Sequence, residues 1–209
     1  FDVFFFGGGQ DRQQFLVEKD LKNKSSVLKH EIESGIPLLS VCGGYQLLQK
    51  YFKTKTGETI EGIGVFNAYT LGTEDRMIQN LIININPSLQ IQIESVYPTT
   101  HLPNYLTTQL IGFENHSGKT YLESTSQPLG TVVVGKGNNG EDKTEGAIYK
   151  NAIGTYMHGS LLPKNPHLAD FLISKALEKN YGKVELVPLD DEIEWLAHTQ
   201  ATKRARSQS

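Results

Sequence analysis

The chain has 209 residues, 38% of them hydrophobic, and a formal net charge of −3. This length allows one sizeable core, so we expect one domain or a domain with an extension. The charge balance argues against nucleic acid or an anionic membrane as the main partner, and no apolar run approaches the roughly 20 residues of a transmembrane helix. The single cysteine excludes an internal disulfide and a multi-cysteine zinc site, and it fits a reducing cytosol.

The first fifty residues predict a parallel α/β arrangement. The apolar run Asp2–Phe6 ends in three glycines and predicts a buried strand. Gln13–Ser34 predicts a helix that Gly35 caps, Leu38–Val41 a second buried strand, and Tyr45–Phe52 a second helix. The order strand, long helix, strand, turn, helix is typical of a parallel sheet covered by helices.

The middle of the chain predicts antiparallel strands. They are expected at Leu81–Ile85, in the alternating run from Leu89 to Ile93, and at Gln109–Phe113. Asn86-Pro87 and the proline-rich stretch 98–103 interrupt them.

The last third predicts a hairpin, a strand and two helices. Thr131–Val134 and Glu145–Tyr149 flank a polar loop and predict the hairpin, and Ile153–Met157 predicts a strand that leads directly into His158. A helix begins at Asn165-Pro166 and ends near residue 182, and a last helix follows residues 190–191. We therefore divide the chain into a main domain, 1–189, and a C-terminal helix with a solvated basic tail, 190–209.

Two glycine-rich stretches imitate nucleotide-binding motifs. Residues 135–140 match G-x-G-x-x-G but precede a polar loop and a strand rather than a helix, so they predict a hairpin loop. Gly118-Lys119-Thr120 imitates the end of a phosphate-binding loop, but the required first glycine is Phe113.

Cys42 stands where a predicted buried strand turns into a helix. A lone cysteine is often a buried core residue, but Gly43 and Gly44 permit the sharp turn that presents a nucleophile at the carboxyl edge of a sheet. The N-terminus of the following helix favours the thiolate. We therefore favour a nucleophile at Cys42, with a structural cysteine as the alternative.

A thiolate that attacks an amide needs a histidine to move protons. Four of the six histidines lie in helical patterns, in the proline-rich loop or near the C-terminus, which leaves His116 and His158. We favour His158 because it ends a strand and precedes a glycine, so it should emerge at a sheet edge; a structural role in that turn is the alternative. Backbone N–H groups of Gly43 and of the turn at residues 7–9 could hold an oxyanion.

Several segments resemble a known family. SVCGGYQLL, around Cys42, is similar to the nucleophile motif G-x-C-x-G-x-Q of class I, triad-type glutamine amidotransferases, and GTYMHG, around His158, resembles the histidine motif of their cobyric-acid-synthase-like branch. Four longer segments resemble the glutaminase subunits of lipid II isoglutaminyl synthases and extend the likeness over most of the chain: FFFGGGQDR (4–12), GFENHSGKTY (112–121), GNNGEDKTEG (137–146) and GTYMHGSLLPKNP (154–166).

The resemblance implies a fold and a set of roles. The fold would be a flavodoxin-like α/β three-layer sandwich, with a central, mostly parallel sheet and an antiparallel extension. Cys42 would be the nucleophile and His158 the general base and acid, while Arg76 and Gln46 would hold the substrate L-glutamine. The oxyanion hole would consist of backbone N–H groups, those of Gly8, Gly9 and Gly43.

The resemblance also implies a partner. A Mur-ligase-like subunit would form a heterodimer with this chain and use ATP and Mg²⁺ to activate the D-glutamate α-carboxyl of lipid II. This chain would supply ammonia from glutamine without a cofactor or metal of its own. The rival functions are the glutaminase component of a corrinoid-amidating synthetase, a partner-independent cysteine hydrolase of the same fold, and a non-catalytic subunit.

The chain departs from the family pattern in a few places. Many class I members carry glutamate two residues after the histidine, where this chain has Ser160, so the third triad member is absent, replaced from elsewhere or supplied by the partner. Ser40 replaces the first glycine of the nucleophile motif. Residues 86–110 are a longer segment than expected, which suggests a flap or an interface. Relatives begin with a further strand and helix, so we expect a segment upstream of Phe1.

Overall fold

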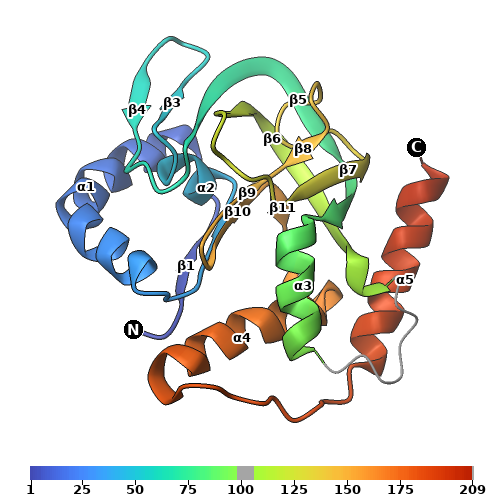
Figure 1. Cartoon of the computed structure of the whole chain (residues 1–209). Helices are drawn as coiled ribbons and strands as arrows, with labels where there is room; N and C mark the ends of the chain where they lie inside the picture. The colour runs from blue at the N-terminus through green and yellow to red at the C-terminus, as the bar shows by residue number, and fades with distance from the viewer. Residues whose placement is uncertain (98–105, 209) are drawn as a thin grey trace.

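The computed structural model describes residues 1–97 and 106–208 (Figure 1). The helices are α1 (Asp11–Glu33), α2 (Gly43–Leu47), α3 (Pro87–Val96), α4 (Pro166–Tyr181) and α5 (Glu192–Ser207), with 3-10 turns η1 (Leu106–Thr108) and η2 (Leu162–Lys164). The strands are β1 (Phe4–Phe6), β2 (Leu38–Val41), β3 (Tyr51–Lys53), β4 (Thr59–Glu61), β5 (Ala68–Ile85), β6 (Gln109–Leu122), β7 (Gly130–Val134), β8 (Thr144–Glu145), β9 (Ala147–Tyr149), β10 (Ala152–Thr155) and β11 (Met157–His158).

The strands form two sheets. In the first, the order is β1-β2-β10-β9, and β1, β2 and β10 are parallel while β9 is antiparallel. In the second, the order is β11-β6-β5-β3-β4, with β7 on β5 and β8 on β7. The long strands β5 and β6 form its curved antiparallel centre (Figure 1). The predicted α/β class, a mostly parallel sheet with an antiparallel extension, is confirmed.

The parallel sheet separates two hydrophobic cores, which is the three-layer arrangement. Leu38 and Ala152 pack with Leu28 and other residues of α1 in one core. Leu39 and Ile153, one residue further along the same strands, pack with the apolar face of α4 in the other. Successive side chains of a strand point to opposite faces, so near-continuous apolar strands are required here.

Strand β1 is not buried as predicted. It lies at the edge of the parallel sheet, and the Phe5 side chain is 67% exposed. Among the described strands, β2 alone pairs with β1, and Phe4 lies opposite Leu38.

The predicted helix Tyr45–Phe52 is mostly wrong. Helix α2 has only five residues, and Tyr51 and Phe52 belong to strand β3, which pairs with both β4 and β5. The chain leaves the helix at Gln49, whose buried side chain is hydrogen-bonded to Thr70 and Thr120. These tertiary contacts outweigh the local spacing of apolar residues.

The run from Leu89 to Ile93 is a helix, not an alternating strand. The Asn86 side chain accepts a hydrogen bond from the Ser88 N–H, and Pro87 occupies the first helical turn, as is typical of a helix start. Leu89 and Ile93, four residues apart, are buried against α4, and the intervening Ile91 is 69% exposed. The described part of the 86–110 segment therefore contributes to the core, while its proline-rich stretch lies outside the described residues.

The last third follows the prediction with three changes. Strands β7 and β8 form a hairpin around residues 135–143, but the predicted second strand, Glu145–Tyr149, divides: β8 ends at Glu145, and Ala147–Tyr149 is β9, which pairs with β10 in the other sheet. Gly118–Thr120 lies within β6, so neither glycine motif forms a nucleotide loop. The predicted strand at 153–157 divides into β10 and β11, which belong to different sheets. The basic run is exposed as predicted, but it forms the last turns of α5 rather than a tail. Within the described ranges, no helix has the length and apolar character needed to cross a membrane.

Paired alanine substitutions in α3 test its helical packing. We expect Ile93→Ala to lower the free energy of unfolding by about 2–5 kcal/mol, because it leaves a cavity in the core. Ile91→Ala should change it by less than about 0.5 kcal/mol, because that side chain is exposed. Chemical denaturation of each variant gives both values. Equal losses would contradict the helix, because an alternating strand buries residues 91 and 93 on the same face.

Candidate functional site

Three parallel strands end at one edge of the first sheet and place the candidate residues there. The glycine turn at residues 7–9 follows β1, Cys42 follows β2, and Tyr156 follows β10. The strands are in register up to these ends, with Phe6 opposite Ser40 and Val41 opposite Thr155. This edge is where open α/β sheets bind ligands.

Cys42 has the backbone of a strained turn. Its φ is 52° and its ψ is −110°, and its N–H donates to the Thr155 carbonyl at 2.9 Å. Such a conformation is costly for a residue with a side chain and persists only where its surroundings enforce it. Here they do: a Cβ built on Gly44 would lie 2.6 Å from the Phe6 carbonyl oxygen, and one on Gly43 would lie 2.8 Å from the Gly9 carbonyl oxygen.

Cys42 and His158 meet at Gly8. A Cβ built on Gly8 would lie 3.5 Å from Cys42 Cβ and 3.6 Å from His158 Cε1. The two side chains are 116 positions apart in sequence, yet both lie next to Gly8 in the glycine turn. The structure brings together the predicted nucleophile, the predicted base and a predicted oxyanion residue.

A cavity of about 880 Å³ opens at this point. Its walls include all the predicted site residues except Gly43, namely Gly8, Gly9, Cys42, Gln46, Arg76 and His158. They also include residues outside that predicted set: Gln10, Gln14, Phe52, Lys55, Gly72, Thr73, Glu74, Asn115, His116, Ser117 and Gly118. A second cavity, of about 680 Å³, lies between α1, β9 and the 64–67 segment and contains none of the predicted residues. Among the residues that the structure describes, no group of three or more His, Cys, Asp or Glu side chains could hold a metal ion.

His158 is half-buried and lacks a carboxylate partner in the described part of the chain. Burial lowers its pKa below the ordinary histidine value, and the electrostatic interaction with His116 lowers the pKa further. A hydrogen bond with the Asn115 backbone opposes this shift. His158 Nε2 is buried and has no hydrogen-bond partner among the described residues. Ser160, at the place of the family's glutamate, is exposed.

Arg76 reaches the cavity from the irregular part of β5. The β5–β6 pairing shifts register between Gly72 and Met77, so this stretch is released from regular pairing. Arg76 Nε donates to Asn115 Oδ1 at 2.8 Å, and the guanidinium is exposed to the cavity. Asn115 therefore touches two candidates, Arg76 through its side chain and His158 through its backbone. Sequence analysis missed this link, although Asn115 lies within a segment that carried the resemblance.

Gln46 lines the cavity but is almost fully buried. Its Oε1 accepts from Gln14 Nε2 at 2.9 Å, and its Nε2 donates to the Tyr156 hydroxyl at 3.2 Å. The sequence offered no signal for Gln14, which is a polar residue one turn into a largely polar helix. Contact between Gln46 and a substrate stays a prediction.

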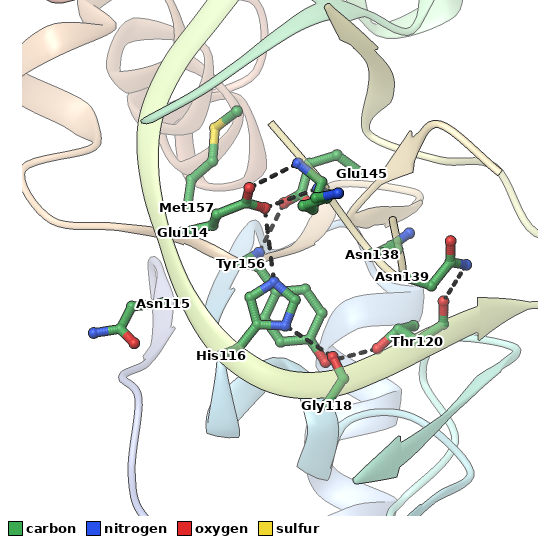
Figure 2. A network of polar contacts seen from close by, with 12 residues as sticks. Glu114, Asn115, His116, Gly118, Thr120, Asn138, Asn139, Glu145, Tyr156 and Met157 are labelled. Atoms are coloured by element: carbon green, nitrogen blue, oxygen red, sulfur yellow. Dashed lines mark hydrogen bonds and ion pairs between the residues drawn. The ribbon is translucent and has the colours of Figure 1, made fainter. Parts of the chain in front are cut away.

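A buried polar network supports the cavity from the side of β6 (Figure 2). The His116 ring stacks on Tyr156 with centroids 3.6 Å apart, and His116 Nδ1 donates to the Gly118 carbonyl at 2.8 Å. His116 Nε2 faces the buried carboxylate of Glu114 at 3.8 Å. That carboxylate accepts backbone N–H groups from the 135–137 turn. His116, the second histidine of the sequence analysis, lines the same cavity, but its Nδ1 is engaged by the Gly118 carbonyl.

Glu145 is the other buried carboxyl group of this network. It accepts from Thr155 Oγ1 and from the Tyr156 N–H, both at 2.7 Å. Burial raises the pKa of Glu145 to about 7 despite these hydrogen bonds. The carboxyl group fixes the chain where β10 ends and β11 begins.

The glycine backbone offers donors for an oxyanion. Among the described residues, no hydrogen bond is recorded from the N–H groups of Gly8 or Gly9. Gly43 is the first residue of α2, so its N–H has no acceptor within the helix. The sequence predicted that the N-terminus of a longer helix would favour the Cys42 thiolate. Helix α2 has only five residues, so a single turn of N–H groups lies next to Cys42.

Comparisons with known proteins agree with this geometry. A family model described as the CobB/CobQ-like glutamine amidotransferase domain matches residues 1–166. The chain is 39% identical over 207 residues to a Staphylococcus aureus (strain N315) protein named lipid II isoglutaminyl synthase (glutamine-hydrolyzing) subunit GatD, covering 99% of this chain and 76% of that protein. It is 39% identical over 194 residues to a Streptococcus pneumoniae (strain ATCC BAA-255 / R6) protein of the same name, covering 92% and 68%.

A solved structure supports the fold alone. A crystal structure of a glutamine amidotransferase superimposes with a TM-score of 0.53 at 14% identity, covering 84% of this chain and 79% of that one. The family model covers well over half of the chain, and the strand–turn–helix at Cys42 lies within it. The chain belongs to the CobB/CobQ-like glutamine amidotransferase family.

Proposed function

We propose that this chain is the glutaminase subunit of a two-subunit amidotransferase. It hydrolyses L-glutamine to glutamate and ammonia, and a Mur-ligase-like partner uses the ammonia to amidate the D-glutamate α-carboxyl of lipid II. The observation that carries the proposal is the meeting of Cys42 and His158 beside Gly8, at the bottom of a cavity that also exposes Arg76. The names of the two relatives at 39% identity favour this reaction over corrinoid amidation.

The first half of the reaction transfers the glutamyl group to the enzyme. The Cys42 thiolate attacks the side-chain carboxamide carbon of glutamine, and a C–S bond forms. The N–H groups of Gly43 and of Gly8 or Gly9 hold the oxyanion. His158 gives a proton to the amide nitrogen, the C–N bond breaks, and ammonia leaves.

The second half releases glutamate. Neutral His158 takes a proton from water, whose oxygen attacks the thioester carbon. The C–S bond then breaks, which regenerates the thiolate and releases the γ-carboxylate of glutamate. His158 is therefore neutral after ammonia leaves and is protonated again when glutamate is released, ready for the next turnover. Its lowered pKa favours the neutral form that activates water.

Arg76 is the proposed holder of the substrate α-carboxylate. A guanidinium can bind a carboxylate through two parallel hydrogen bonds, which fixes both position and orientation. Asn115 accepts from the Nε of Arg76, which lines the cavity, and the terminal nitrogens are the groups that would bind the carboxylate. Gln46 completes this side of the pocket.

The partner supplies the remaining chemistry. We place ATP and Mg²⁺ on the ligase subunit, in a heterodimer, and we assign the reaction to the cytoplasm, where a thiol is kept reduced. Lipid II contacts the complex through that subunit. The missing carboxylate at His158 is the part of the site that the partner would complete.

Substitution of the nucleophile tests the proposed function. We expect Cys42→Ala to reduce glutamine hydrolysis in the complex by at least about 10³-fold, because no other residue can form the thioester. Glutamate release and glutamine-dependent amidation of lipid II should fall together. Glutaminase activity retained by Cys42→Ala would refute the mechanism.

Ammonium salts provide the control for that experiment. The Cys42→Ala complex should still amidate lipid II when ammonium chloride replaces glutamine, because the ligase subunit is intact. Loss of both activities would instead show that the substitution disrupted the complex.

The titration of His158 tests the environment of the base. Because burial and electrostatic interactions with His116 and Arg76 lower its pKa, we expect its ring signals to titrate below about 6.5 in the isolated chain. Arg76→Gln removes the guanidinium charge, so the midpoint should rise. NMR of the ring protons, assigned through the signal lost in His158→Gln, measures both. A midpoint above 6.5 in the unsubstituted chain contradicts the described environment.

Dependence on the partner separates this function from a partner-independent hydrolase. We expect the isolated chain to hydrolyse glutamine at least about tenfold more slowly than the complex, because His158 has no orienting carboxylate among its described contacts. Steady-state glutaminase assays with increasing amounts of the ligase subunit measure the difference. Full activity of the isolated chain would favour the hydrolase.

A further inference from the structure

Gln14 lies beneath the glycine turn and joins three elements of the site. It belongs to the first turns of α1, and its side chain is 3% exposed. Its Nε2 donates to Gln46 Oε1 at 2.9 Å and more weakly to the Gly9 carbonyl at 3.5 Å. One amide group thus connects α1 to the turn after β1 and to the helix after Cys42.

The same amide also lies against Gly43. A Cβ built on Gly43 would lie 3.0 Å from Gln14 Nε2, 2.8 Å from the Gly9 oxygen and 2.9 Å from the Gly9 nitrogen. Gly43 therefore lies against Gly9, another of the proposed oxyanion donors. The Gln14 amide lies beside both of them.

The other half of the Gln14 amide is unsatisfied. Gln14 Oε1 is buried without a hydrogen-bond partner among the described residues. Burying an unpaired carbonyl opposes folding, so an apolar side chain of the same length would suit the fold better. The hydrogen bonds that Nε2 donates to Gln46 and Gly9, rather than a gain in folding stability, explain why a polar amide stands at this position.

We propose that Gln14 is a positioning residue of the glutaminase site, and that its donated hydrogen bonds hold the Gly9 peptide and the Gln46 amide around Gly43. This inference rests on the proposed function, because it assigns the held peptides to the oxyanion hole. Gln14 also sets the direction of the Gln46 amide: with Oε1 turned to Gln14, Nε2 must face the Tyr156 hydroxyl. It does not touch the reacting atoms.

Gln14→Met tests the proposal in the assembled complex. Methionine keeps the length and flexibility of glutamine but cannot donate. We expect kcat for glutamine hydrolysis to fall about 10- to 100-fold, somewhat less than the loss from removing an oxyanion donor outright. KM should change less than about threefold, because Arg76, the proposed holder of the α-carboxylate, is positioned by Asn115 and not by Gln14.

Alkylation of Cys42 by iodoacetamide separates positioning of the oxyanion hole from damage to the nucleophile. Displacement of iodide forms no oxyanion, so the alkylation rate of Gln14→Met should stay within about twofold of the unsubstituted chain. Mass spectrometry of the peptide that contains Cys42, the only cysteine in this chain, measures the rate. The thermal unfolding midpoint should stay equal or rise, because the unpaired carbonyl is gone.

Two further variants complete the test. Gln13→Met, at the exposed neighbouring position on the same helix, is the matched control and should leave kcat unchanged. Gln14→Glu keeps the shape, but its carboxylate cannot donate to Gln46, so it should lose as much kcat as Gln14→Met. Gln14→Glu also decides the question if Gln14→Met does not fold.

The outcomes distinguish this inference from the function on which it rests. Unchanged kcat in both Gln14 variants would overturn the positioning role, and so would a parallel loss of alkylation rate and unfolding midpoint. A rise in KM alone would show substrate contact instead and would also overturn it. An unsubstituted complex that does not hydrolyse glutamine would refute the proposed function itself.

Discussion

The site depends on the close approach of three strand ends, which leaves no room for side chains between them. A Cβ built on Gly44 would lie 2.6 Å from the Phe6 oxygen, and one on Gly154 would lie 2.1 Å from the Tyr45 ring. Such distances require glycine at these positions, and they force the turn after β2 into its positive φ at Cys42. The strain at Cys42 is thus balanced by the packing of β1, β2 and β10.

The second constraint is the crossing of the chain from one sheet to the other at Tyr156. Strand β10 ends in the parallel sheet, and β11 pairs with β6 in the antiparallel one. Glu145 holds this junction through Thr155 and the Tyr156 N–H, and burial raises its pKa to about 7. The crossing carries His158 to the edge where Cys42 emerges and sets it beside Asn115.

The parts that the sequence predicted are those with local signals. The apolar run of β2 and the Asn-Pro start of α4 were assigned correctly, and strand ends located Cys42 and His158. The same Asn-Pro signal was misread at α3, because alternating apolar residues also fit a strand. Gln14 could not be found from sequence, since its contacts are with Gln46, 32 positions away, and with Gly43.

Burial and the groups around His158 determine which protonation state of its ring is favoured. Burial and electrostatic interactions with His116 and Arg76 favour the neutral imidazole of His158. The neutral ring suits proton abstraction from water, but the same environment disfavours the imidazolium that gives its proton as ammonia leaves. A carboxylate at the ring would stabilise that imidazolium and fix its orientation. The described chain holds its buried carboxyl groups elsewhere, at Glu114 and Glu145. Under the proposed mechanism, a carboxylate brought by the ligase subunit would therefore activate glutamine hydrolysis only where the ammonia can be used.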